Sequence, residues 1–137
     1  PKHIIVTELV RGGSLYDLLH RNRHVPDWSL SQVVGIGREI CLGMVYLHAQ
    51  DIVHCDLKSS NVLLNGPLQV KICDFGLAHL LDDAAPQEPA VGRSTINIGC
   101  VGTHHWMAPE VLRGEEYSRA ADVYSFGMIL WEMISRQ

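Results

Sequence analysis

Paired cysteines are missing from this 137-residue sequence. Its four cysteines are scattered and none forms a Cys-x-x-Cys pair, so no structural zinc site is indicated. So few cysteines in a chain of this length also make a disulfide framework an unlikely design, and reduced thiols are the default in the cytosol. We therefore expect a cytoplasmic protein, or one on the cytosolic side if the parent protein is anchored in a membrane.

Basic residues and long apolar runs are also scarce. The 11 Lys and Arg residues are outnumbered by 15 Asp and Glu, so the positive footprint of a nucleic-acid-binding protein is absent. No apolar run approaches the roughly 20 residues that span a bilayer. We expect neither a nucleic-acid partner nor a membrane segment. With 47% hydrophobic and 19% charged residues the composition is globular, and the N-terminal PKHII is neither a signal peptide nor a starting methionine, which suggests a piece of a longer protein.

Hydrophobic periodicity predicts a chain of helices and short strands. The β-branched run 3–10 is typical of a buried strand. Ser14 and Asp17 form a capping-box pattern that opens a short helix to about His20. A second capping box at Ser29 begins a helix that ends near His48, whose predicted buried face is Val33, Ile36, Gly37, Ile40, Met44 and Leu47.

The second half of the chain adds short strands and one more helix. Runs at 62–64 and 69–72 flank the turn signal Asn-Gly-Pro, which predicts a hairpin. Residues 82–102 have little periodicity and are expected to form a long irregular segment. A strongly apolar helix is expected from Ser118 onward, with its apolar positions at Val123, Phe126, Gly127, Leu130, Met133 and Ile134.

Polar motifs interrupt this apolar pattern in a specific order. A lone Asp-Phe-Gly would carry little weight, whereas several motifs in order are specific. They are HCDLKSSN (54–61), DFG (74–76), GT (102–103), WMAPE (106–110) and DVYSFG (122–127). In order and spacing, over essentially all 137 residues, the chain resembles the C-terminal lobe of a eukaryotic protein kinase.

The resemblance implies a protein-kinase-like α+β fold, mainly helical with short β-hairpins and incomplete at both ends. Residues 1–13 would be the hinge region, and residues 14–137 the C-terminal lobe through part of its long central helix. Some of the hydrophobic content would then face absent parts of the domain, so we expect it to be exposed.

The resemblance also assigns the chemistry. Phosphoryl transfer from ATP requires an oriented nucleophile and neutralised phosphate charge. Asp56 matches the catalytic base that orients the substrate hydroxyl, and Lys58 matches the lysine that meets the transferring phosphate. Asn61 and Asp74 match the Mg²⁺ ligands, and oxygen ligands suit this ion. The implied cofactors are ATP and Mg²⁺, and the implied partner is a protein substrate.

Two residues bear on the substrate class. Lys58 in DLKSSN is typical of serine/threonine kinases, since tyrosine kinases usually have alanine and arginine in this stretch. Thr103 fits the same class, where it bridges Asp56 and Lys58. The motif sequences are most similar to those of the tyrosine-kinase-like group of serine/threonine kinases. A dual-specificity enzyme, which also phosphorylates tyrosine, is the alternative.

The first strand resembles the hinge that holds adenine. Thr7 would be the gatekeeper, and the backbones of Glu8 and Val10 would bond the purine edge. Ser14 would approach the ribose, and Leu63 would form the floor under adenine. A strand leading to a helix, and an ordinary core leucine, explain the same residues.

Supporting roles follow from the same resemblance. His54 and Phe75 match two members of a stacked apolar spine, with Gly76 completing the DFG motif. Asp122 matches a buried aspartate that bonds the catalytic-loop backbone; the alternative is a first-turn acid facing the helix dipole. Glu110 belongs to the Ala-Pro-Glu motif, where its pairing arginine would lie beyond residue 137.

The chain departs from the family at Cys55, where most kinases have an arginine. That arginine reaches a phosphorylated activation-segment residue, and cysteine cannot make such a charge-assisted pair. Ser94 and Thr95 are the candidate phosphosites, so their phosphate would have one fewer partner. An exposed flexible loop explains these two residues equally well.

Two parts of the family pattern are absent from the sequence. It holds neither a Gly-x-Gly-x-x-Gly loop nor a lysine after Val-Ala-Ile, which cover and position the phosphates. A pseudokinase or scaffolding module is therefore the alternative to a catalytic serine/threonine kinase. The survival of Asp56, Lys58, Asn61 and Asp74 favours the enzyme.

We predict that residues 1–137 alone transfer no measurable phosphate, whereas the longer parent protein does, because the phosphate-covering parts are missing from these residues. The measurement is phosphate transfer by the purified 137-residue chain, with Asp74→Ala as the blank. Activity of the wild-type chain above that blank would contradict the prediction.

Overall fold

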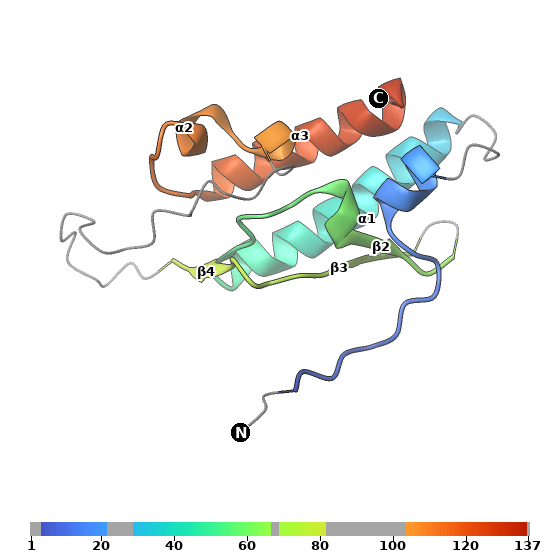
Figure 1. The fold of residues 1–137 in the computed structure, drawn as a ribbon, viewed down its shortest axis with the longest axis horizontal. Helices are drawn as coiled ribbons and strands as arrows, with labels where there is room; N and C mark the ends of the chain where they lie inside the picture. The colour runs from blue at the N-terminus through green and yellow to red at the C-terminus, as the bar shows by residue number, and fades with distance from the viewer. Residues whose placement is uncertain (1–3, 22–28, 67–68, 82–103, 137) are drawn as a thin grey trace.

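Two long helices dominate the computed structural model, which describes residues 4–21, 29–66, 69–81 and 104–136. Helix α1 (Leu30–Ala49) lies beside α3 (Arg119–Ser135), and β3 (Val70–Ile72) packs on α1 away from α3 (Figure 1). Short elements complete the described fold: η1 (Asp17–Arg21), β1 (Ile52–Val53), η2 (Ser59–Asn61), β2 (Val62–Leu64), β4 (His79–Leu80), η3 (His104–Trp106) and α2 (Pro109–Leu112). The predicted mainly helical α+β fold with short hairpins is confirmed.

Helix α1 begins at the predicted capping box. The Ser29 hydroxyl accepts the Gln32 N–H at 3.3 Å, and the Gln32 side-chain oxygen Oε1 accepts the Ser29 N–H at 2.9 Å. Both bonds satisfy N–H groups that a helix start leaves without partners. The buried residues are those that the periodicity predicts: Val33, Ile36, Gly37, Ile40, Met44 and Leu47.

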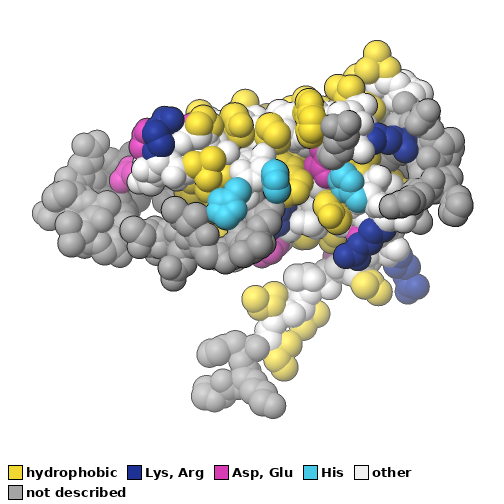
Figure 2. Space-filling model, turned by 45° about the horizontal axis from the view of Figure 1, so that its top comes forward, with side chains coloured by type: hydrophobic (Ala, Val, Ile, Leu, Met, Phe, Trp, Pro, Cys, Tyr) yellow, Lys and Arg dark blue, Asp and Glu magenta, His cyan; other side chains and the backbone are white. Residues whose placement is uncertain are grey.

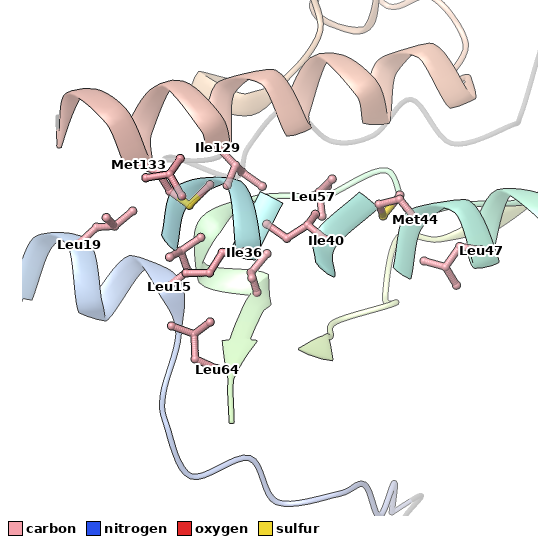
Figure 3. Packing of buried hydrophobic residues seen from close by; sticks show 12 residues of the cluster. Leu15, Leu19, Ile36, Ile40, Met44, Leu47, Leu57, Leu64, Ile129 and Met133 are labelled. Atoms are coloured by element: carbon pink, nitrogen blue, oxygen red, sulfur yellow. The ribbon is translucent and has the colours of Figure 1, made fainter. Parts of the chain in front are cut away.

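The core lies between α1, α3 and the β2–β3 hairpin. Ile129 and Met133 point from α3 toward α1, while Leu64 approaches from β2 (Figure 3). The predicted hairpin is antiparallel and pairs Val62 with Ile72 and Leu64 with Val70. A second small antiparallel sheet joins β1 to β4. Helix α1 packs against β3 of the hairpin and against β1 of the second sheet, so both small sheets lie against this helix.

The short helix after Ser14 also forms. The Ser14 hydroxyl accepts the Asp17 N–H at 3.0 Å and donates to the Asp17 carboxylate at 2.7 Å. This differs from a full capping box, because the Asp17 side chain bonds the Ser14 hydroxyl. From Asp17 to Arg21 the turns widen to π-helical geometry, and Leu19 is buried there.

The predicted strand at 3–10 is wrong for its described part. Residues 4–10 form no strand, and the apolar side chains up to Leu9 are exposed, as Ile5 and Val6 show at 89% each. A strand needs hydrogen-bonding neighbours, and no described strand pairs with this segment. The β-branched composition alone could not provide one.

The predicted apolar positions of α3 divide between the core and the surface, since Met133 is buried and Phe126 and Leu130 pack against the core. Val123 and Ile134 are exposed at 62% and 68%, whereas Asp122, Ser125 and Glu132 are buried. Their spacing is also helical, so a polar stripe shares the inward face with Ala121, Ile129 and Met133. Hydrogen-bond donors and acceptors in the interior satisfy these polar groups, and hydrophobicity alone does not predict their burial.

Exposed apolar side chains are numerous, as expected. Figure 2 shows hydrophobic side chains in a row along the upper part of the molecule, where α3 lies. The large exposed apolar residues of the two long helices are Leu30, Val34, Leu42, Val45, Tyr46, Val123, Tyr124, Trp131 and Ile134.

The expectation of no membrane-length segment needs one correction. By length and composition alone, α1 could cross a membrane, with a mean hydropathy of 1.3 over its best window. The helix instead contributes its buried face to the core and carries the ion pair of Arg38 with Glu39 on its exposed side. Core helices commonly have this composition.

Helix α1 supplies a stability prediction. Ile40 is fully buried, whereas Val45 on the same helix is 65% exposed. Ile40→Ala should lower the free energy of unfolding by about 2–5 kcal/mol, because it removes buried methyl groups and leaves a cavity. Val45→Ala should stay within about 0.5 kcal/mol. Urea unfolding measures both changes, and equal losses would contradict the packing described here.

Candidate active site

The loop 54–58 is fixed by a carboxylate that comes from α3. Asp122 accepts the His54 N–H at 2.9 Å and the Cys55 N–H at 3.1 Å, one on each carboxylate oxygen. The ring of His48, on α1, lies 2.8 Å from the same carboxylate. A buried carboxylate needs such partners, and here they tie the loop to both long helices.

Asp56 is the central side chain of this loop. It is 8% exposed, and its Oδ2 lies 2.7 Å from the Lys58 ammonium. The Asn61 amide donates to the Asp56 carbonyl at 2.8 Å and to Oδ2 at 3.2 Å. Oδ1 is buried and accepts no hydrogen bond within the described part of the chain. An acceptor left in this state carries an energetic cost, and such atoms are found at catalytic positions.

His54 connects this loop to the DFG motif. Its Nδ1 accepts the Asp56 N–H at 3.3 Å, so its Nε2 carries the proton and donates to the Cys73 carbonyl at 3.1 Å. The His54 ring also packs against Phe75, with the ring centroids 5.3 Å apart. The Cys73 N–H donates to the Asn61 carbonyl at 2.9 Å. Both backbone groups of Cys73 are therefore bonded to the loop, directly before Asp74.

Asp74 presents its carboxylate at the surface. Its φ of 64° lies in the left-handed region, which Asp adopts more readily than most residues. The Gly76 N–H lies 3.4 Å from Asp74 Oδ1, and a Cβ at Gly76 would stand 3.3 Å from the same oxygen. Glycine therefore leaves room for the carboxylate.

The side chains that match the Mg²⁺ ligands fit that ion chemically. The side-chain nitrogen of Asn61 donates to Asp56, which leaves its side-chain oxygen Oδ1 as the atom that could bind the ion. Asp74 adds an exposed carboxylate. Two hard oxygen donors suit Mg²⁺, which keeps several waters. No cluster of three or more His, Cys, Asp or Glu side chains occurs among the described residues.

The predicted adenine side is only partly assembled. Ser14 pairs with Leu63 as an isolated bridge, and the Leu64 N–H donates to the Gly13 carbonyl at 2.9 Å. Thr7 and Glu8 are exposed and Val10 is half-buried. The Glu8 carboxylate lies 3.1 Å from the Lys71 ammonium, an exposed pair that contributes little.

A close approach explains one glycine in this region. A Cβ at Gly12 would stand 1.9 Å from the Leu64 carbonyl oxygen, which is backbone and cannot move aside. Any larger residue would push the chain at Gly12 away from Leu64 and disturb the neighbouring bond from the Leu64 N–H to the Gly13 carbonyl.

The other predicted site residues lie elsewhere. Glu110 is in the first turn of α2, and no ion pair joins it to another described residue. Thr103, Ser94 and Thr95 lie outside the described residues.

Comparison with known proteins now settles the family. The family model described as protein tyrosine and serine/threonine kinase matches residues 1–137, the whole chain. The chain belongs to the protein kinase family.

Named kinases are similar over nearly the whole chain. The serine/threonine-protein kinase STY46 of Arabidopsis thaliana is 40% identical over 136 residues, which are 98% of this chain and 22% of STY46. CTR1 of the same plant is 40% identical over 139 residues, covering 100% of this chain and 16% of CTR1. A probable serine/threonine-protein kinase of Dictyostelium discoideum is 44% identical over 133 residues, 96% of this chain and 29% of that kinase. The chain spans less than a third of the length of each.

This kinase chain carries a neutral thiol at Cys55. Burial, followed by the nearby Asp122 carboxylate, raises the pKa of Cys55 to about 12. Its Sγ lies 3.5 Å from the Val53 carbonyl oxygen, and its φ is 64°. Cys55 therefore brings no charge beside Asp56. Burial also raises the pKa of Tyr117 to about 12, with smaller contributions from Cys55, Asp56 and Asp122.

Sequence reasoning missed a second buried carboxylate in the kinase chain. Glu132 is 3% exposed and contacts His20, Ser59 and Trp106. No periodic signal marks it, because a step of ten residues from Asp122 is about 80° short of three full helical turns. His48 was missed for a similar reason, because its partner Asp122 is distant in sequence.

The raised pKa of Cys55 predicts a specific alkaline instability. Below pH 9.0, the ordinary pKa of cysteine, the Cys55 thiol is protonated in both the folded and the unfolded chain. Above that pH the unfolded chain loses the thiol proton, whereas the folded chain keeps it up to its raised pKa of about 12. The free energy of unfolding should therefore fall more steeply in wild type than in Cys55→Ala between these pH values. Urea unfolding at about pH 8 and about pH 10.5 measures the difference.

Cys55→Ser serves as the control, because serine does not titrate in this range but keeps a polar group. Both variants should flatten the alkaline fall. A fall as steep in the two variants as in wild type would contradict the assignment.

Proposed function

We propose that the protein is a serine/threonine kinase that transfers the γ-phosphate of ATP to serine or threonine hydroxyls of a protein substrate. The observation that carries this proposal is the Asp56 carboxylate. One of its oxygens is held by Lys58 and Asn61, and the other is buried and accepts no bond from the described residues. An oriented acceptor of this kind suits the proton of an incoming hydroxyl.

The neighbouring side chains complete the proposed chemistry. Asp56 orients the substrate hydroxyl and accepts its proton, while the Lys58 ammonium, 2.7 Å from Oδ2, supplies positive charge beside the transferring phosphate. Asn61 and Asp74 would hold Mg²⁺, which neutralises phosphate charge when bound. The bonds of Cys73 to His54 and Asn61 keep Asp74 close to this loop.

The remaining assignments are proposals of the same kind. The backbones of Glu8 and Val10 would meet the purine, Ser14 the ribose, and Leu63 the adenine face; the bridge between Ser14 and Leu63 supports this side of the site. Thr103 would bridge Asp56 and Lys58. Ser94 and Thr95 would be phosphosites, and Glu110 would have a structural role.

Asp122 is proposed to act through the backbone of the catalytic loop. Its two bonds to His54 and Cys55 favour this role over that of a first-turn acid that merely faces the helix dipole. We propose a role in signalling, because phosphorylation of proteins is a means of regulation. We also propose a cytoplasmic location, because the scattered cysteines are typical of reduced thiols.

Asp56→Asn tests the proposed function in the full-length protein. The amide keeps the shape of the side chain but cannot accept the proton, so kcat should fall by about 10²–10⁴-fold. Phosphate transfer from ATP and Mg²⁺ to a general protein substrate measures the change. Asp51→Asn is the matched control, because Asp51 is exposed and pairs with Arg119 outside the site.

Two outcomes would contradict the proposal. Unchanged activity in Asp56→Asn would remove Asp56 from the chemistry. Nucleotide binding without phosphate transfer in wild type would favour a pseudokinase or scaffold instead. Phosphate found on tyrosine as well as serine or threonine would indicate dual specificity.

A further inference from the structure

Glu132 joins three segments that lie far apart in sequence. Its Oε1 accepts the Ser59 hydroxyl at 2.7 Å and lies 2.7 Å from His20 Nε2, and its Oε2 accepts the Trp106 Nε1–H at 3.0 Å. These partners come from η2, η1 and η3 respectively. A carboxylate this deeply buried is stable only with such donors.

The bond to Ser59 leads directly to the proposed active site. Ser59 is fully buried and opens η2, whose last residue is Asn61. The Asn61 N–H donates to the Lys58 carbonyl at 2.9 Å, and its side chain holds Asp56. A shift of Ser59 would therefore move Asn61 together with the turn.

The loop is consequently fixed at both ends by carboxylates of one helix. Asp122 bonds the backbone at His54 and Cys55, before Asp56, and Glu132 bonds Ser59, after it. Trp106 is also held twice by α3, since the Ser125 hydroxyl donates to its carbonyl at 2.6 Å. Helix α3 thus sets the positions of η2 and η3 relative to each other.

We propose that Glu132, acting through Ser59, is a positioning residue for Asn61 and so for the metal that Asn61 would hold. The inference rests on the proposed function. Glu132 touches no reacting atom in this scheme; it controls the geometry of a ligand in the way that outer partners of metal ligands do, where substitutions typically cost about 10–100-fold in metal affinity or activity.

Neighbouring serines in η2 provide the test. Ser59 is buried against Glu132, whereas Ser60 is exposed. In the full-length protein with ADP, Ser59→Ala should weaken Mn²⁺ binding, measured by electron paramagnetic resonance, by about tenfold. Ser60→Ala should stay within about twofold, since it makes the same chemical change without touching Glu132. Apparent Mg²⁺ affinity in the kinase assay should follow the same order.

Glu132→Gln provides an independent arm that keeps the side-chain shape. Its amide nitrogen cannot accept a hydrogen bond, so the amide cannot accept from both Ser59 and Trp106 as the carboxylate does, and Mn²⁺ affinity should fall as it does in Ser59→Ala. Because both act on one bond, the double variant should lose less than the product of the single losses. A loss equal to that product would overturn the link through Ser59.

Hydrogen exchange separates this inference from the proposed function. Without metal or nucleotide, the backbone amides of residues 57–62 should exchange their hydrogens faster in Ser59→Ala than in Ser60→Ala, because only the first variant removes the bond to Glu132. Equal exchange, or equal Mn²⁺ affinity, in the two variants would overturn the positioning role. Faster exchange in Ser59→Ala with no Mn²⁺ binding in wild type would instead refute the metal-dependent function, and with it the metal part of the inference.

Discussion

The burial of Asp122 is the constraint on which the arrangement of the site depends. Its carboxylate accepts hydrogen bonds from the backbone N–H groups of His54 and Cys55, and no described helix or strand offers these groups another acceptor. Leaving these two donors unpaired would cost about 1–3 kcal/mol each. These bonds therefore hold the loop before Asp56 against α3. They also hold Cys55 at a φ of 64°, in the left-handed region, which a residue other than glycine adopts at an energetic cost.

Helix α3 thus combines two properties that usually exclude each other. It packs Ile129 and Met133 into the core against α1, and it buries Asp122 and Glu132 on the same side. The carboxylates are tolerated because each receives hydrogen bonds from loop or short helical segments that have unused donors. Helix α3 therefore connects the polar loop and short helical segments to the hydrophobic core.

The site is rigid in its loop and open beside it. His54, Asp56 and Asn61 are buried and bonded to one another through side chain and backbone, whereas Asp74 and Phe75 are exposed. Preorganisation of the first group avoids the cost of ordering it during a reaction. The exposed DFG residues are held to it mainly through the bonds of Cys73 and the packing of Phe75 on His54.

The sequence by itself determined the local elements and the family. Helix α1 with its capping box, the β2–β3 hairpin and the ordered motifs depend on neighbouring residues, whose periodicity and spacing can be read directly. The tertiary structure decided the rest. Residues 4–9 are exposed because a strand needs a partner, and α3 turns Asp122 and Glu132 inward because their donors come from segments up to 112 residues away. Hydrogen bonds between such distant residues leave no periodic trace in the sequence, so only the folded chain shows which polar side chains face the core.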